Sequence, residues 1–219
     1  MVWLVLSLAH AGELNFSPDR PGVGDATATV GAGAIMVEGG LAATVDNPAA
    51  IGTSGIVGRI GLFDPAEVRV RVPDVTFFDG EAYVGQIGLG AKVGGALDDH
   101  WAISMVPELF IETDGGEVGG NVGTNLSYSV DNVGVWVYNA VGVTQAGTGG
   151  FFGGGLSYWI DPVGIYVNGG HGFNGDPLIG GGGWLALSDR AQLDAGVDMT
   201  LIGGTAYPVV LFGASAGFD

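Results

Sequence analysis

The side chains with the most obvious chemistry in this sequence are a few charged residues. Six residues are Lys or Arg and 23 are Asp or Glu, which gives a formal net charge of −17. That balance argues against nucleic acid and anionic lipid head groups as partners, because both are bound by clustered Lys and Arg. Four of the six basic residues fall between positions 59 and 92, namely Arg59, Arg69, Arg71 and Lys92. They could form ion pairs with acidic neighbours or line a charged passage.

Residues suited to catalysis or to cofactor binding are few. There is no Cys, and of the three His residues only His171, with Asp176, could form an acid–base pair, but no well-placed Ser accompanies them. The glycine runs at 22–33 and 180–183 lack the phosphate-binding pattern G-x-x-x-x-G-K. The acidic residues of the predicted loops lack the spacing of a calcium-binding EF-hand. We therefore expect no enzyme activity, no cofactor and no bound metal.

The elements that must position the charged residues have the pattern of long β-strands. From about residue 33, apolar residues alternate with Gly or polar residues; residues 193–201, for example, read Leu-Asp-Ala-Gly-Val-Asp-Met-Thr-Leu. These segments run for at least nine residues, whereas strands of soluble proteins average about 5 or 6 and membrane-spanning strands need about 9 to 11. Gly, at 44 of 219 residues, is about three times its usual roughly 7% frequency. The pattern predicts an all-β protein, an antiparallel transmembrane up-and-down β-barrel.

Counting the alternating segments gives about twelve strands. They are expected at 33–45, 55–63, 66–74, 82–97, 101–113, 118–130, 133–144, 150–160, 163–173, 177–187, 191–202 and 208–218. The connections between them alternate in length, with longer loops predicted at 46–54, 75–81, 114–118, 145–149, 172–176 and 203–207. Outer-membrane barrels have short periplasmic turns and longer outer loops, so we expect both termini on the periplasmic side.

The N-terminal region lacks strand-like alternation. Residues 1–11 are interpreted as a signal peptide, because an apolar stretch precedes Ala9-His10-Ala11, and the barrel is expected over 33–219. Residues 12–32 are expected to form either a short plug in the periplasmic mouth or a flexible tether. In the plug, Asp19 and Arg20 would be the key residues, with Arg20 reaching Glu38 or Asp194.

Alternation also assigns the charged side chains to one face of the strands. The basic residues Arg59, Arg69, Arg71 and Lys92 are all predicted to point into the lumen, as are the acidic residues Glu38, Glu108, Glu112, Asp194 and Asp198. One interpretation is an ion-pair network that fills the barrel, because unpaired charge in a confined lumen is costly. The other is a transverse field that selects polar or anionic solutes. Twelve strands lie between filled eight-stranded barrels and open sixteen-stranded porins, so any passage must be narrow or gated.

Several short motifs, in order, resemble a family of outer-membrane barrels. The opening has Asp19-Arg20-Pro21, then Thr29-Val30 before a Gly, and then Glu38-Gly39-Gly40; Arg59-Ile60-Gly61-Leu62 and Gly213–Phe218 are similar to later strands of the family. The family is named for a putative role in the MetA pathway of phenol degradation, and its members are often described as transporters.

This resemblance implies a passive outer-membrane pore or uptake channel for small hydrophobic or weakly polar molecules. The implied partners are outer-membrane lipid, the small-molecule solute and the outer-membrane assembly machinery, which would act through the C-terminal strand. The chain departs from the family pattern by ending Phe218-Asp219, where a terminal aromatic residue is usual. The alternative is a structural or surface-interaction barrel with a closed, ion-pair-filled lumen.

Overall fold

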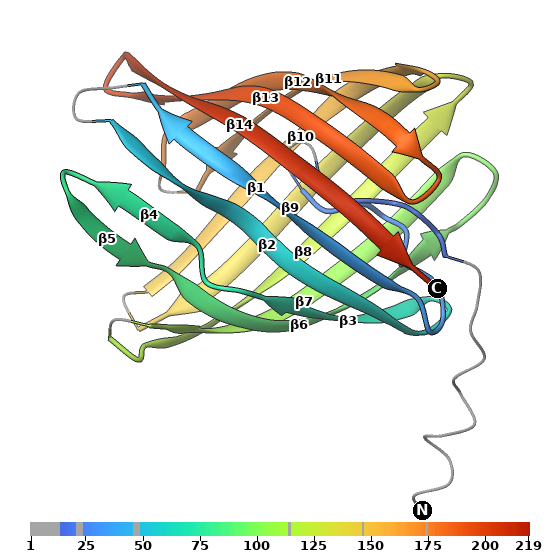
Figure 1. Ribbon diagram of the computed structural model, residues 1–219, viewed down its shortest axis with the longest axis horizontal. Coiled ribbons are helices and arrows are strands. Elements are labelled where there is room, and N and C mark those ends of the chain that lie inside the picture. The colour runs from blue at the N-terminus through green and yellow to red at the C-terminus, as the bar shows by residue number, and fades with distance from the viewer. Residues whose placement is uncertain (1–13, 21–23, 46–48, 114, 146, 174) are drawn as a thin grey trace, which may run out of the picture.

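The computed structural model shows a closed antiparallel β-barrel (Figure 1) and describes residues 14–20, 24–45, 49–113, 115–145, 147–173 and 175–219. The predicted signal peptide at 1–11 lies outside these residues. The described chain contains no helix long and apolar enough to cross a membrane. Twelve strands form the wall: β1 (Ile35–Thr44), β2 (Ala50–Phe63), β3 (Ala66–Arg71), β6 (Gln86–Ala96), β7 (Trp101–Glu112), β8 (Val118–Val130), β9 (Val133–Thr144), β10 (Gly147–Ile160), β11 (Val163–Gly172), β12 (Pro177–Ser188), β13 (Ala191–Ile202) and β14 (Thr205–Phe218).

The wall closes where the first strand meets the last. Strand β1 pairs with β14 from Ile35↔Phe218 to Thr44↔Val209, and its other edge pairs with β2. Closure gives each of the twelve wall strands a partner on both sides. A span in lipid needs such pairing because no water is available to replace missing hydrogen bonds. The predicted fold class and the count of about twelve wall strands are thus confirmed.

Two further strands form a hairpin where the sequence predicted a loop at 75–81. They are β4 (Val75–Phe78), which pairs with β2, and β5 (Glu81–Val84). The loop prediction was wrong because Asp79-Gly80 makes a tight turn, with φ of 51° and 82° at its two residues, and Asp-Gly is a favoured hairpin pair. Pro73 lacks the N–H that a continuous ladder needs, so β3 and β4 remain separate strands.

The two ends of the barrel carry different connections. Short turns after β2, β6, β8, β10 and β12 lie at one end, together with Phe218 and the start of β1; we call this the short-turn end. Connections at the opposite end are shorter than predicted, because 50–54, 147–149 and 205–207 continue their strands instead of forming loops. Local turn residues suggested loops there, but pairing with a neighbouring strand extends the ladder past them.

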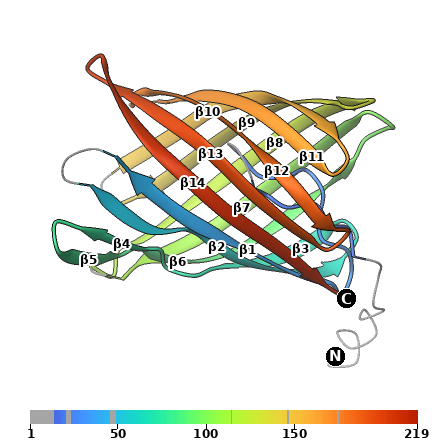
Figure 2. The ribbon, with the colours of Figure 1, turned by 45° about the horizontal axis from the view of Figure 1, so that its top comes forward.

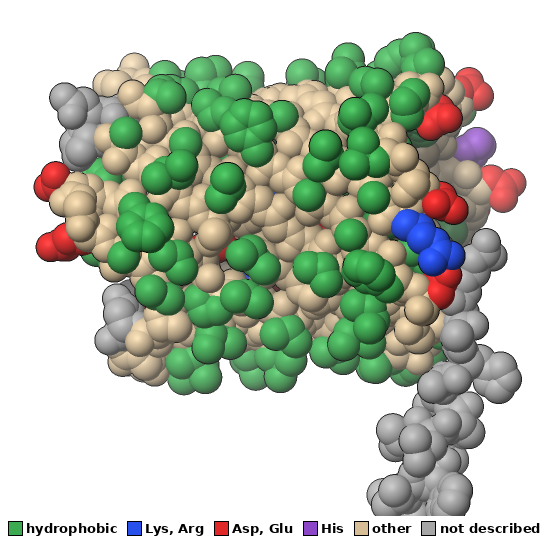
Figure 3. All heavy atoms as spheres, viewed as in Figure 1, with side chains coloured by type: hydrophobic (Ala, Val, Ile, Leu, Met, Phe, Trp, Pro, Cys, Tyr) green, Lys and Arg blue, Asp and Glu red, His purple; other side chains and the backbone are tan. Residues whose placement is uncertain are grey.

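The outer wall is apolar and the inner wall is not. Strand β7 shows the alternation, with Leu109 65% exposed on the outer face and Ser104 2% exposed on the inner face. Apolar side chains are spread over the outer face, while acidic side chains gather at the two ends (Figure 3). An apolar band between charged rims is the outer surface that a transmembrane barrel presents to lipid.

A charged residue at an outward position should strongly lower the stability of the folded barrel. Replacing Leu126 or Val197, both exposed on the outer face, with Arg should destabilise the folded barrel by roughly 2–4 kcal/mol if the residue lies near the bilayer midplane. Ser129→Arg, on the inner face of β8, is the control and should cost much less. Folding titrations into lipid vesicles measure the difference, and equal losses at inner and outer positions would contradict the membrane assignment.

Candidate functional site inside the barrel

The described part of the N-terminal region, residues 14–20 and 24–34, lies inside the barrel, and we call it the inner segment (Figure 2). The backbone N–H of Gly33 in this segment donates a hydrogen bond to the carbonyl of Gly61, near the end of β2, at an N···O distance of 2.9 Å. Side chains from several strands then hold its backbone. The carbonyl of Ala28 accepts hydrogen bonds from Arg59 and Lys92, and that of Arg20 accepts one from Gln192 at 3.1 Å. The segment therefore contacts the wall on more than one side.

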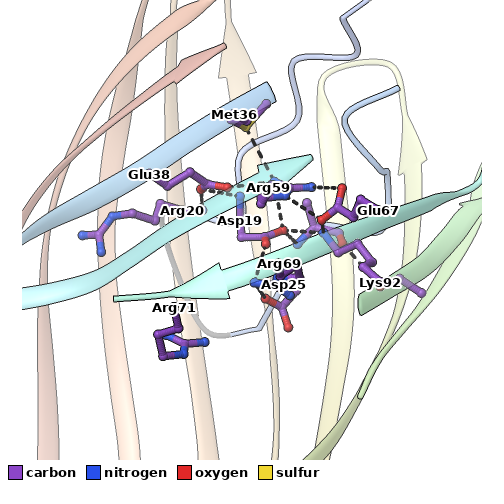
Figure 4. A network of polar contacts seen from close by, with 12 residues as sticks. Asp19, Arg20, Asp25, Met36, Glu38, Arg59, Glu67, Arg69, Arg71 and Lys92 are labelled. Carbon is purple, nitrogen blue, oxygen red and sulfur yellow. Dashed lines mark hydrogen bonds and ion pairs between the residues drawn. The ribbon is translucent and has the colours of Figure 1, made fainter. Parts of the chain in front are cut away.

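Arg59 is the most enclosed cation of the lumen. It lies on β2 and is 0% exposed. Its Nε and Nη2 donate to the two carboxylate oxygens of Glu67 at 2.7 and 3.0 Å, and its Nη1 donates to Glu38 at 2.8 Å (Figure 4). Nη1 also donates to the carbonyl of Ser17 at 2.8 Å. Two carboxylates from adjacent strands thus compensate one buried guanidinium and connect it to the inner segment, as a buried charge requires.

Asp19 of the inner segment lies among three cations of the wall. Its carboxylate is 2.6 Å from Nζ of Lys92, 2.8 Å from Nη2 of Arg69 and 3.4 Å from Nη1 of Arg59. Figure 4 shows it between Arg59 and Arg69. Burial raises the pKa of the Asp19 carboxyl, but the positive charges of Lys92, Arg59 and Arg69 outweigh burial and hold the pKa well below its usual range. Asp19 is therefore the anionic anchor of the segment.

Two further ion pairs flank this cluster. The guanidinium of Arg20 reaches Asp194 on β13, with an Nη2–Oδ1 distance of 3.3 Å, while the backbone N–H of Arg20 donates to Glu38. Both contacts named for Arg20 in the sequence analysis are thus present, one by the side chain and one by the backbone. Arg71 pairs with Glu108 at 2.8 Å and is 27% exposed at its side chain, so it is more accessible than Arg59.

Two of the acidic residues predicted to face the lumen do so without a partner cation among the described residues. Glu112 on β7 and Asp198 on β13 are half-buried at inward positions, and no ion pair is found for either within the described ranges.

Five of the six basic residues form ion pairs inside the barrel, namely Arg20, Arg59, Arg69, Arg71 and Lys92, while Arg190 pairs with Asp219 at the exposed short-turn end.

Sequence reasoning missed two acids of the network. Glu67, 0% exposed, lies two positions before Arg69 on β3, so the alternation that assigned Arg69 to the lumen also points Glu67 inward. Asp25 pairs with Arg69 at 2.8 Å. It belongs to the irregular inner segment, where no periodicity reports which way a side chain faces.

The other half of the lumen holds a cavity of about 550 Å³ between the inner segment and the wall formed by β8 to β13. The strands contribute no Lys, Arg, Asp or Glu to its lining, whereas the inner segment contributes Asp19, Arg20 and Asp25. The strand side chains that line it are aromatic or small and polar: Trp136, Trp159, Trp184, Tyr166, Asn125, Ser127, Ser129, Ser157 and Gln192. We call the side formed by β1, β2, β3, β6 and β7, where most ion pairs lie, the ion-paired side, and the side lined by the Trp and Ser residues the aromatic side. The inner segment contacts both sides.

No group of three or more His, Asp or Glu side chains among the described residues could hold a metal ion. His171 is exposed near the end of β11, and its ring Nδ1 contacts the carbonyl of its neighbour Gly172.

Removing the anchor charge should loosen the inner segment. We expect Asp19→Asn to lower the free energy of opening the segment by roughly 3–5 kcal/mol, because it leaves buried cations without their partner. Hydrogen exchange of the backbone amides of residues 24–34, followed by mass spectrometry, measures this opening. Asp99→Asn, in an exposed turn, is the control. Unchanged exchange in Asp19→Asn would mean that the segment is held by its backbone contacts alone.

Comparisons with known proteins show the fold and no more. No family model and no curated protein matches the sequence. Solved structures do match: the COG4313 outer membrane channel from Pseudomonas putida F1, with 11% identity over 91% of this chain and 99% of that chain, has a TM-score of 0.66. The KdgM porin matches with 8% identity over 84% of this chain and 99% of that chain, with a TM-score of 0.63. The NanC porin matches with 10% identity over 83% of this chain and 98% of that chain, with a TM-score of 0.60.

These neighbours are porins and a channel. They do not confirm the phenol-degradation family that the motifs resemble. In fold, the chain is a twelve-stranded barrel of the porin-like outer-membrane type.

Proposed function

We propose that this protein is a narrow outer-membrane pore or uptake channel for small hydrophobic or weakly polar molecules. The observation that carries the proposal is the cavity of about 550 Å³ beside the inner segment. That volume falls within the roughly 300–1,000 Å³ of small-molecule sites. The cavity follows the inner face of β8 to β13 near the short-turn end. In this proposal a solute enters the lumen there and passes along this wall rather than through the ion-paired side.

The strand side of the cavity suits neutral solutes. Three Trp rings offer apolar contact, while Ser129 and Ser157 offer single hydrogen bonds. The basic residues Arg59 and Lys92, in contrast, are 0% exposed and held by carboxylates. Asp19, Arg20 and Asp25 line the segment side of the cavity, but each is held in an ion pair. In this proposal the charged cluster anchors the inner segment and does not sort solutes by charge.

A closed barrel is the second candidate, and one observation favours it. The inner segment also contacts the aromatic side: Thr27 Oγ1 lies 3.0 Å from Ser127 Oγ, and Asn125 donates to the carbonyl of Asp25. If these contacts persist, the segment spans the lumen and the barrel has a structural role.

The remaining parts of the proposal concern assembly and orientation. The C-terminal strand β14 ends with Phe218, which is 54% exposed on the outer face. This residue would be recognised by the outer-membrane assembly machinery, and the short-turn end would face the periplasm as in other such barrels.

Filling the cavity tests the proposed path. In planar bilayers the wild-type protein should give discrete channel events, and Ser157→Trp should reduce conductance several-fold, because a large ring would occupy the cavity beside the existing Trp side chains. Leu156→Trp adds the same ring to the adjacent outward position of β10 and should leave conductance unchanged. Equal conductance in both variants would place the path elsewhere. A correctly folded but silent wild-type protein would favour the closed barrel.

A further inference from the structure

Aromatic side chains of the inner wall lie directly opposite glycines on neighbouring strands. In the strand register Phe110 faces Gly119, Trp136 faces Gly155, Tyr166 faces Gly182 and Trp184 faces Gly164. All eight residues occupy inward positions. The pairs extend from β7 to β12, and three of the four rings, those of Trp136, Tyr166 and Trp184, line the cavity.

The glycines are required for the observed ring positions. A Cβ atom on Gly164 would lie 2.0–2.4 Å from three atoms of the Trp184 ring. A Cβ on Gly119 would lie 2.3 and 2.4 Å from two atoms of Phe110, and one on Gly155 would lie 2.4 Å from Trp136. Such separations are far below van der Waals contact, so each of these three rings occupies the space that a side chain on the opposite strand would fill. At Gly182 the closest atoms to an added Cβ are instead backbone atoms of Ala195 and Gly196.

The direction in which a displaced ring would move follows from the cavity. Trp136 and Trp184 both line it, while the backbone of the adjacent strands lies behind them. A ring that is pushed off its glycine therefore moves into the lumen. At Gly164 the nearest atoms all belong to the Trp184 side chain, so the ring can yield without movement of the backbone.

We infer that these glycines set the bore of the lumen by allowing aromatic rings to lie flat against the wall. Gly164, with Trp184, is the clearest size-determining pair. The expected effect on transport rests on the proposed channel function. The geometric part of the inference is that the glycine keeps the ring out of the cavity, and this part holds for an open or a closed barrel.

The decisive variant is Gly164→Ala, and the matched control is Gly149→Ala. Gly149 is also an inward strand glycine, on β10, but no atom of the described residues lies within 4 Å of a Cβ placed there. We expect Gly164→Ala to lower single-channel conductance roughly twofold and to exclude the larger of a series of neutral sugars in liposome swelling. Gly149→Ala should match the wild type in both measurements.

A second readout does not depend on conduction. The chain has no Cys, so Ser157→Cys provides a unique thiol in the cavity wall. Reaction of this thiol with a water-soluble methanethiosulfonate reagent should be several-fold slower when Gly164→Ala is added, and unchanged when Gly149→Ala is added. If the wild type is silent in bilayers but labelling is slowed in this way, the proposed channel function fails and the inference about the rings stands.

A double variant separates ring displacement from general damage to the wall. Trp184→Ala should raise conductance and speed labelling. Gly164→Ala with Trp184→Ala should behave as Trp184→Ala alone, because the added methyl then has no ring to displace. If Gly164→Ala does not fold, Trp184→Ala still tests the inference, since this change must enlarge the lumen. Unchanged labelling in folded Gly164→Ala, or in Trp184→Ala, would overturn the inference.

Discussion

The interior of this barrel depends on the pairing of buried cations with carboxylates. Arg59 and Lys92 are fully enclosed, and a charge in that position is tolerated only where opposite charges and hydrogen bonds replace water. Glu38 and Glu67 supply part of this compensation from the wall, and Asp19 supplies the rest from the inner segment. Wall and segment therefore require each other, since among the described residues Arg69 of the wall pairs only with Asp19 and Asp25 of the segment.

This mutual requirement explains why the lumen is asymmetric. All four basic residues of the wall lie on β2, β3 and β6, so the inner segment is drawn to that side. The opposite wall, from β8 to β13, carries aromatic and hydroxyl groups at its cavity, together with glycines that accommodate the rings. Ion pairs anchor the segment mainly on one side of the lumen. On the other side, the glycines leave room for the aromatic rings at the wall. The unusual amount of Gly in this chain thus has a role in the lumen as well as in turns.

Much of the fold could be predicted from local pattern, and the failures have local causes. Alternation of apolar and small residues reports which face a strand position occupies, because successive side chains of a strand point to opposite sides. Strand number and inward charges such as Arg69 followed from it. The hairpin at β4 and β5 was missed although Asp79-Gly80 signalled it, and Glu67 was overlooked although it shares a face with Arg69. Both errors lay in applying the pattern and not in the pattern itself.

By itself, the sequence determined the barrel, the apolar exterior and the inward set of charges, because each depends on spacing along a single strand. Only the tertiary structure decided which acid meets which base. The bidentate contact between Arg59 and Glu67 depends on the register of two strands, and the position of Asp19 depends on the path of an irregular segment across the lumen. Neither register nor path has a local signature, because both are set by the closure of the wall and by the neutralisation of charge within it.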